Sequence, residues 1–145
     1  MTKLREELEV DRPIDEVFAF VGDFANAEDW DPGVEESELL TDGPVDVGTR
    51  YRVVAVFNGR RLPIGYRVTE WDPPRRVVLE GVGSTFRGVD EIAFDPTPSG
   101  GTRITYQADL RLRGPLRLFE PLMRKRFEQT GREAMVGMRR ALLRA

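Results

Sequence analysis

Asp90 is the residue in this 145-residue sequence whose position most favours acid–base chemistry. It belongs to the stretch 84–94, where the alternation that places Ile92 and Phe94 on the inner face of a strand also places Asp90 there. A carboxyl group on an apolar face is partly desolvated, so its pKa rises toward the range that suits proton transfer. Two structural alternatives compete: a β-bulge that turns Asp90 to solvent, or an ion pair with Arg87 or another arginine.

The only three tyrosines, Tyr51, Tyr66 and Tyr106, fall on the predicted inner face of the same sheet. Each phenol seeks a hydrogen-bond partner when it is buried, so the tyrosines could orient a ligand carbonyl or hydroxyl group in an apolar pocket. Alternatively, they are ordinary sheet residues whose hydroxyl groups reach the backbone or water. Asp90 is therefore the one weak candidate for a catalytic residue, with a tyrosine as the alternative proton-transfer group.

The absence of two residue types excludes several classes of catalytic site and metal site. The sequence contains no histidine and no cysteine. A Ser-His-Asp triad, a histidine-ligated metal, a thiolate nucleophile and a zinc–thiolate site are thereby excluded. Any catalysis must use carboxylates, tyrosine, lysine, arginine or ordered water, and we predict neither a metal nor a cofactor.

Charge and hydropathy limit the partners. The chain has 25 acidic and 22 basic residues and a net charge of −3, so no long-range field favours nucleic acid. Charges interrupt the apolar runs, and none approaches the ~20 apolar residues of a membrane span. We expect one soluble, cytoplasmic domain over residues 1–145, with no integral membrane segment and no nucleic-acid partner. The oligomeric state stays open.

Two basic stretches, RKRFE at 124–128 and MRRALLR at 138–144, allow contact with nucleic acid or an anionic membrane. No aromatic platform is interleaved with them, and Glu120, Glu128 and Glu133 lie in the same predicted helix. A solvated polar helix face is therefore the favoured interpretation.

Hydrophobic periodicity predicts the elements that position these side chains. Residues 4–10 alternate as a half-exposed strand. Apolar residues then recur at helical spacing up to Val21, and Gly22 ends this short helix. A second short helix covers 23–30 and stops before Pro32, since a residue that precedes proline avoids the α region.

The dipeptide Asn58-Gly59 is the clearest of several turn signals that divide the middle of the chain into antiparallel strands. Both residues tolerate positive φ, which suits a two-residue type I′ hairpin. The resulting register pairs Tyr51 with Tyr66 on an apolar face. The opposite face carries Arg50, Arg52, Arg61 and Arg67.

The last strand and the last helix complete the predicted fold. Residues 103–113 alternate apolar and polar side chains, so the sheet has one apolar face. A helix over 115–144 must cover that face, and Pro121 either kinks this helix or starts its main run. Its predicted inward stripe consists of Phe119, Met123, Phe127, Gly131, Ala134, Met135, Met138 and Leu142.

The order of these elements resembles the helix-grip fold of the START/polyketide cyclase-like superfamily (SRPBCC). Four stretches carry the resemblance: VDRPIDEVFAFVGDFANAEDWDPGV (10–34), VGTRYRV (47–53), WDPPRRVVLEG (71–81) and SGGTRITYQADL (99–110). Their order and spacing are characteristic over nearly the whole chain. The resemblance implies an α+β helix-grip fold, in which a curved antiparallel β-sheet wraps around a long C-terminal α-helix and two short helices follow the first strand. Because the family has no universal catalytic residue, the resemblance implies a ligand-binding fold but no particular reaction.

The resemblance also implies an apolar cavity between the sheet and the long helix, with its mouth near the short helices. Trp30 would stand at that mouth, held by the Pro32-Gly33 turn; the alternative is that it caps the core. Gly131 either leaves volume for a ligand beside Tyr106 or allows close packing of the helix backbone. The predicted ligand-binding residues are Trp30, Tyr51, Val53, Tyr66, Asp90, Ile92, Tyr106, Phe119, Met123, Phe127, Gly131 and Met135.

Three functions are compatible with a cavity between the sheet and the long helix. The first is binding or transport of a small hydrophobic molecule, such as a lipid, a polyketide or an aromatic metabolite, helped by flexible methionines on the long helix. The second is a polyketide cyclase- or dehydratase-like enzyme that uses a carboxylate or tyrosine of the cavity. The third is a protein-interaction module.

Overall fold

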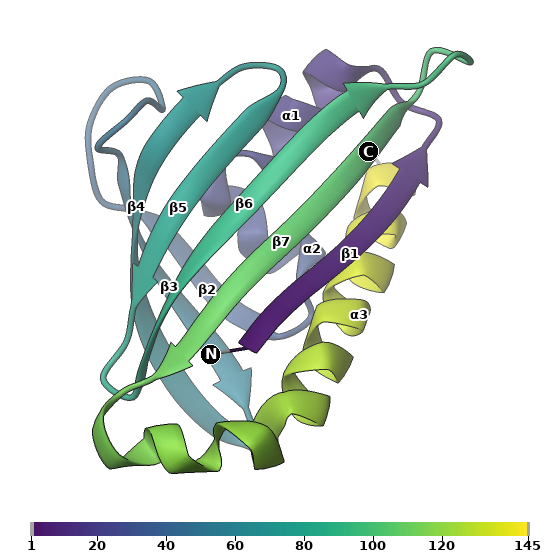
Figure 1. Cartoon of the computed structure of the whole chain (residues 1–145). Helices are drawn as coiled ribbons and strands as arrows, with labels where there is room; N and C mark the ends of the chain where they lie inside the picture. The colour runs from purple at the N-terminus through teal and green to yellow at the C-terminus, as the bar shows by residue number, and fades with distance from the viewer. Residues whose placement is uncertain (1, 145) are drawn as a thin grey trace.

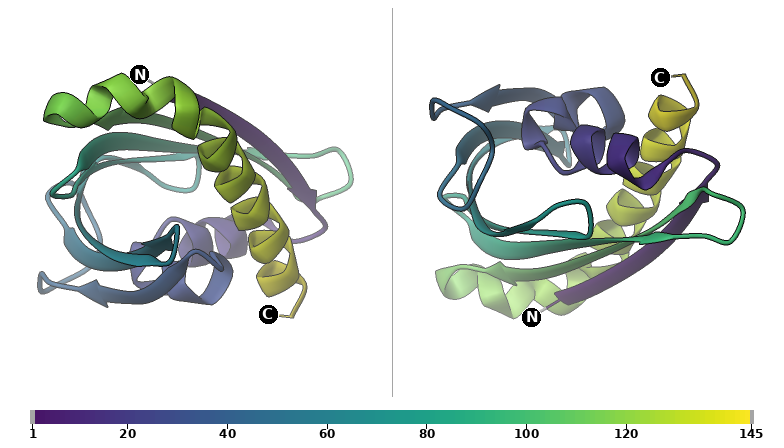
Figure 2. Two further views of the ribbon diagram at one scale, coloured as in Figure 1. Left: turned by 90° about the horizontal axis from the view of Figure 1, so that it is seen from below. Right: turned by 90° about the horizontal axis from the view of Figure 1, so that it is seen from above.

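The computed structural model describes residues 2–144, and it contains the antiparallel sheet and long C-terminal helix that the sequence predicts. The elements are β1 (Thr2–Val10), α1 (Ile14–Val21), η1 (Phe24–Asn26), α2 (Ala27–Trp30), β2 (Val34–Leu39), β3 (Arg50–Phe57), β4 (Arg60–Asp72), β5 (Arg76–Val82), β6 (Phe86–Pro96), β7 (Thr102–Leu112), η2 (Gly114–Phe119) and α3 (Glu120–Arg144). The seven strands lie in the order β1-β7-β6-β5-β4-β3-β2. The sheet curls around one side of α3, which packs against β1 and α2 (Figures 1 and 2). The predicted helix-grip fold is confirmed.

The β3–β4 hairpin has the register that the sequence predicts. Asn58 and Gly59 have φ angles of 54° and 74°, which is the left-handed conformation that a type I′ turn requires. Tyr51 consequently lies opposite Tyr66 on the inner face. One two-residue turn thus places two of the three tyrosines on the sheet face that curls around α3.

The helices begin and end close to their predicted positions. Helix α1 ends at Gly22, and the predicted second helix consists of the 3-10 turn η1 followed by α2. The C-terminal segment is divided at Glu120, so that Pro121 lies in the first turn of α3 and starts its main run. Residues 114–119 form a separate 3-10 helix. No helix within residues 2–144 is long and apolar enough to cross a membrane.

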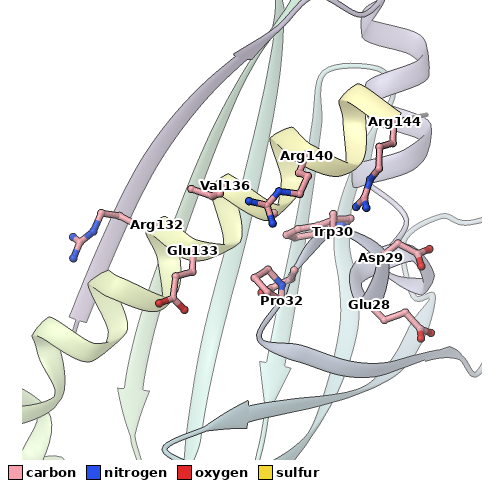
Figure 3. Close-up of a pocket in the computed structure, with 11 residues that line it drawn as sticks. Glu28, Asp29, Trp30, Pro32, Arg132, Glu133, Val136, Arg140 and Arg144 are labelled. Carbon is pink, nitrogen blue, oxygen red and sulfur yellow. The ribbon is translucent and has the colours of Figure 1, made fainter.

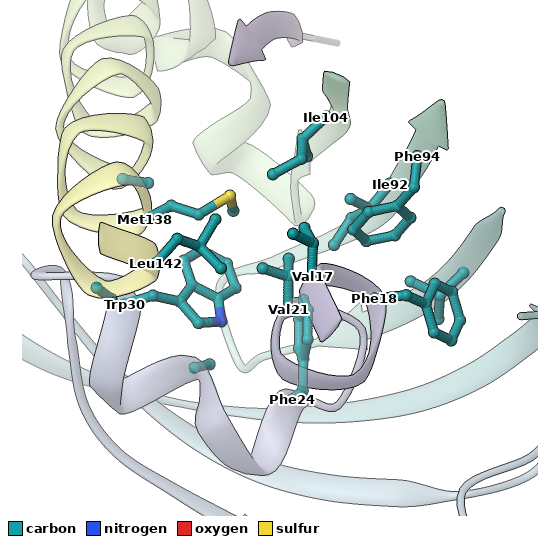
Figure 4. Packing of buried hydrophobic residues seen from close by; sticks show 14 of the residues in the cluster. Val17, Phe18, Val21, Phe24, Trp30, Ile92, Phe94, Ile104, Met138 and Leu142 are labelled. Carbon is teal, nitrogen blue, oxygen red and sulfur yellow. The ribbon is translucent and has the colours of Figure 1, made fainter. Parts of the chain in front are cut away.

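The hydrophobic core gathers at one end of the grip, which we call the packed end. Here α1, η1 and α2 close the space between the sheet and the C-terminal half of α3 (Figures 1 and 4). Phe18 packs edge-on against Phe94 with ring centroids 5.1 Å apart. Around them lie the fully buried side chains of Val17, Val21, Val77, Ile92, Ile104 and Met138. We call the opposite end, where the β3–β4 hairpin, the β5–β6 turn and η2 lie, the open end.

Candidate functional site

A carboxyl group and two phenols meet on the inner face of the sheet. Asp90 on β6 is only 6% exposed. The hydroxyl group of Tyr106, on the adjacent strand β7, donates a hydrogen bond of 2.6 Å to Oδ2 of Asp90. Tyr66 on β4 lies near the same carboxylate, and the negative charge of that carboxylate contributes to the raised pKa of Tyr66. Both structural alternatives for Asp90 are therefore wrong, since it points neither to solvent nor to an arginine.

The local sequence explains how Tyr66 reaches across the sheet to Asp90. Gly81 on β5 is the direct cross-strand neighbour of Tyr66. A Cβ atom at position 81 would lie 2.6 Å from the ring of Tyr66, so the phenol ring occupies the place of a side chain there. On the far side of β5, Asp90 pairs with Leu79. Gly81 is thus a positioning residue for this cluster, although no local pattern in the sequence marks it.

Burial controls the protonation of the cluster. Desolvation raises the pKa of Asp90 to about 6; the Tyr106 hydrogen bond opposes this rise, and the negative charge of Asp31 adds to it. Burial and the neighbouring Asp90 charge raise the pKa of Tyr66 and of Tyr106 well above 10.0. The phenols therefore remain hydrogen-bond donors at neutral pH. Asp90 changes between acceptor and donor close to neutrality.

A second carboxyl group with a raised pKa follows Trp30. Burial raises the pKa of Asp31 to about 6, and the nearby charge of Glu133 contributes to the rise. The hydrogen bond that the Gly33 amide donates to Oδ1 of Asp31, 2.8 Å long, opposes it. This bond also holds the turn at Pro32. Asp31 therefore combines a structural role in the turn with an electrostatic effect on Asp90.

The inner wall is half-exposed toward the open end, in contrast to the packed end. The side chains that share this partial exposure come from β1, β3, β4, β7 and α3; they are Leu4, Glu6, Ala55, Phe57, Leu62, Tyr66, Tyr106, Ala108, Leu110, Leu112, Met123 and Phe127. The rings of Phe57 and Phe127 stack with centroids 5.1 Å apart and join the β3–β4 hairpin to α3. Apart from Glu6 and the two tyrosines this wall is apolar, and Asp90 and its phenols lie where it meets the packed core. The arrangement suits an elongated apolar ligand with a polar group at its inner end.

Trp30 does not stand at an open mouth. It is 2% exposed and lies among Phe24, Met138 and Leu142 in the core (Figure 4). The side chains of α1 and η1 pack beside it, so Trp30 caps the core as the alternative prediction has it, and it also lines a surface groove between α2 and α3. The indole ring lies 6.2 Å from the ring of Tyr106, and no residue within 2–144 accepts a hydrogen bond from its Nε1.

Several other predicted site residues take unexpected places. Phe119 belongs to η2 and is exposed, so its assignment to the inward stripe is wrong: the α-helical period does not extend through a 3-10 turn. Tyr51 is fully buried and donates to Oδ1 of Asp23 at 3.0 Å, away from Asp90. Val53, Ile92 and Met135 are buried in the core. Their contact with a ligand stays a prediction.

The two glycines of α3 with inward contacts differ in the space around them. A Cβ atom at Gly131 would make ordinary contacts with Leu4 and Glu6, at 3.7 and 3.9 Å. The close-packing explanation for Gly131 is therefore wrong, and the space beside it borders β1. At Gly137 a Cβ atom would lie 2.4 Å from the carbonyl oxygen of Trp30 and 2.6 Å from Cδ of Pro32. Close packing thus occurs at Gly137, which no sequence pattern distinguishes from Gly131.

A surface groove of about 460 Å³ separates α2 from α3 (Figure 3). Its lining combines acidic side chains such as Glu28 and Glu133 with Arg132, Arg140 and Arg144. Nothing in the sequence pattern indicates it, since it depends on how two helices pack. A groove lined by solvated charges of both signs suits an apolar ligand less well than the inner wall does.

Comparison with known proteins identifies the family. Solved structures that superpose well include a protein from Thermus thermophilus, with a TM-score of 0.80 and 23% sequence identity over 97% of each chain. An aromatase/cyclase from Streptomyces has a TM-score of 0.77 and 18% identity, with 97% of this chain and 90% of that chain covered. A START superfamily protein from Mycobacterium smegmatis has a TM-score of 0.75 and 15% identity, with 98% of this chain and 94% of that chain covered. At these identities the likeness shows the fold alone. The sequence matches no curated protein. The family model described as "Polyketide cyclase / dehydrase and lipid transport" matches residues 1–143, and the chain therefore belongs to this family.

Proposed function

We propose that the protein binds a small hydrophobic molecule between the sheet and α3. The apolar body of the ligand lies along the half-exposed wall of the open end, and a hydroxyl or carbonyl group reaches Asp90, Tyr66 and Tyr106. The observation that carries this proposal is the 2.6 Å hydrogen bond between Tyr106 and a buried Asp90 at the inner limit of an apolar wall. A buried carboxyl group costs folding free energy, and a role in recognition explains its presence.

A pair of matched probes tests this proposal. 2-Naphthol and 2-methylnaphthalene have similar size, but only naphthol has a hydroxyl group that can donate to Asp90. Equilibrium dialysis at pH 8 is expected to show tighter binding of 2-naphthol. Asp90→Asn is expected to reduce that preference by about five- to tenfold, since a hydrogen bond to a charged group becomes one to a neutral group.

Asp95 provides the matched control, because it lies on the same strand but is exposed. Asp95→Asn is expected to bind both probes as the unmodified protein does. Equal affinity of the unmodified protein for the two probes, or an equal loss in both variants, would contradict the proposal.

A second candidate function is a cyclase- or dehydratase-like enzyme. The observation that favours it is a carboxyl group whose pKa of about 6 lies near neutrality, in contact with two phenols. Such a group can accept a proton from one ligand atom and return it to another. With a linear polyketide substrate, Asp90→Asn is expected to abolish turnover while affinity stays within about tenfold. Full turnover in this variant would exclude Asp90 as the proton-transfer group and leave binding alone.

A further inference from the structure

Exposed apolar side chains cluster at the open end, across η2 and the first turn of α3. Leu118 is 82% exposed and Leu122 is 77% exposed, and Leu116 and Phe119 beside them are exposed as well. Single exposed leucines are normal on protein surfaces, whereas four large apolar side chains within seven residues form a patch that requires an explanation. The segment runs along the outer edge of the open end, and in the view from below no other element lies in front of it (Figure 2).

The same segment carries a strong positive charge. Residues 111–126 contain six basic residues (Arg111, Arg113, Arg117, Arg124, Lys125 and Arg126) and one acidic residue, Glu120, which gives +5, whereas the whole chain carries −3. The carboxylate of Glu120 accepts a hydrogen bond from the amide of Leu112. Arg87 joins this set on the wall of a hollow of about 770 Å³ shared with Arg117 and Leu118. Positive charge therefore surrounds the apolar patch.

We propose that this basic and apolar segment, residues 111–126, docks the protein on the surface of an anionic lipid bilayer. Leucine and phenylalanine side chains on a short helical segment enter the boundary between headgroups and acyl chains, and flanking arginines and lysines contact anionic headgroups. The charge of the segment is complementary to such a surface. A bilayer also requires no preformed groove, and the patch is formed by side chains that project from a helix. The sequence alone favours a solvated polar face at 124–128; the exposure of Leu118 and Leu122 changes that interpretation.

Vesicle sedimentation tests the docking directly. Vesicles of phosphatidylcholine are compared with vesicles that contain 30 mol% phosphatidylserine, at 0.1 M and 0.5 M NaCl. The full chain is expected to bind the anionic vesicles at 0.1 M salt, to bind them at least several-fold more weakly at 0.5 M salt, and to bind phosphatidylcholine weakly. Equal binding to both vesicle types, or no binding at 0.1 M salt, would overturn the proposal.

Two matched pairs of variants locate the docking surface. Leu122→Ser is expected to reduce binding about tenfold, whereas Leu143→Ser, at a 64% exposed position on the same helix, leaves it unchanged. Reversal of charge at Arg124 and Arg126 is expected to abolish binding, and the same reversal at Arg139 and Arg140 to reduce it far less. These positions are exposed, so circular dichroism and melting temperature should match those of the unmodified chain.

Equal effects within either pair would overturn the assignment of the segment. A second copy of the chain is the competing occupant. A dimer in solution that Leu122→Ser dissociates, without vesicle binding, would replace the membrane by a partner chain. The readouts do not depend on any ligand inside the grip, so this proposal and the proposed function fail separately.

Discussion

The two ends of the grip are built from the same sheet and the same helix, yet the inward side chains are buried at one end and half-exposed at the other. At the packed end, α1, η1 and α2 supply Val17, Phe18, Phe24 and Trp30, and every one of these side chains is buried. At the open end the short helix η2 supplies no buried side chain. The inner wall there is half-exposed up to the stacked pair of Phe57 and Phe127. The helices α1, η1 and α2 thus close the core at the packed end, and the polar cluster lies at the boundary between the two regions.

The largest expected contrast between the ends comes from removal of one aromatic side chain at each. Trp30→Ala leaves a large hole in a closed core, and we expect it to lower the free energy of unfolding by about 3–5 kcal/mol. Phe127→Ala removes a half-exposed ring, and we expect a loss of about 1–2 kcal/mol. Urea unfolding measures both. Equal losses would show that the open end is packed as tightly as the other.

The pH dependence of the free energy of unfolding tests the burial of Asp90, which lies between the packed end and the open end. The pKa of Asp90 is 3.8 for an ordinary side chain and about 6 in the folded protein, so the folded state binds more protons than the unfolded state between these values. Stability therefore falls as pH rises through this window, and above pH 6 the charged carboxyl costs about 2–3 kcal/mol. Asp90→Asn removes that cost. We expect it to stabilise the fold at pH 8 by about 1–3 kcal/mol, with a difference that disappears near pH 4.

Chemical unfolding at pH 4, 6 and 8 measures this effect, with Asp95→Asn as the exposed control. Part of the pH dependence should survive in Asp90→Asn, because Asp31 has its own raised pKa. Destabilisation by Asp90→Asn at pH 8 would contradict the account of Asp90 as a group that is unfavourable for folding.

The smallest expected effects separate the two glycines of α3. Gly137→Ala places a methyl group against the backbone of Trp30 and should cost about 1–3 kcal/mol. Gly131→Ala meets only ordinary contacts with Leu4 and Glu6 and should gain about 0.5–1 kcal/mol from helix propensity. Thermal unfolding monitored by circular dichroism distinguishes the two signs. A loss at Gly131 would mean that α3 lies closer to β1 than the structure shows.

Local rules predicted much of this structure from the sequence. The Asn58-Gly59 turn fixed the register that places Tyr66 inside, and strand alternation placed Asp90 inside. The encounter of Asp90 with Tyr66 and Tyr106 was not predictable in the same way. It depends on the order of four strands and on the missing side chain of Gly81, neither of which appears in a local pattern.

The failures have a common physical origin. The family resemblance implies a cavity mouth at Trp30, but the burial of this side chain depends on what packs over it in space. The prediction that Phe119 points inward extends one helical period across residues that form a 3-10 helix. Gly131 and Gly137 look alike in sequence, and only the approach of Trp30 and Pro32 distinguishes them.

The most direct test of the central claim is an isotope-filtered nuclear Overhauser experiment on the complex with 2-naphthol. If the ligand occupies the open end of the grip, its ring protons will show contacts with the methyl groups of Leu62, Leu110 and Met123. Contacts with Val136 in the groove between α2 and α3, or the absence of any contact inside the grip, would contradict the account.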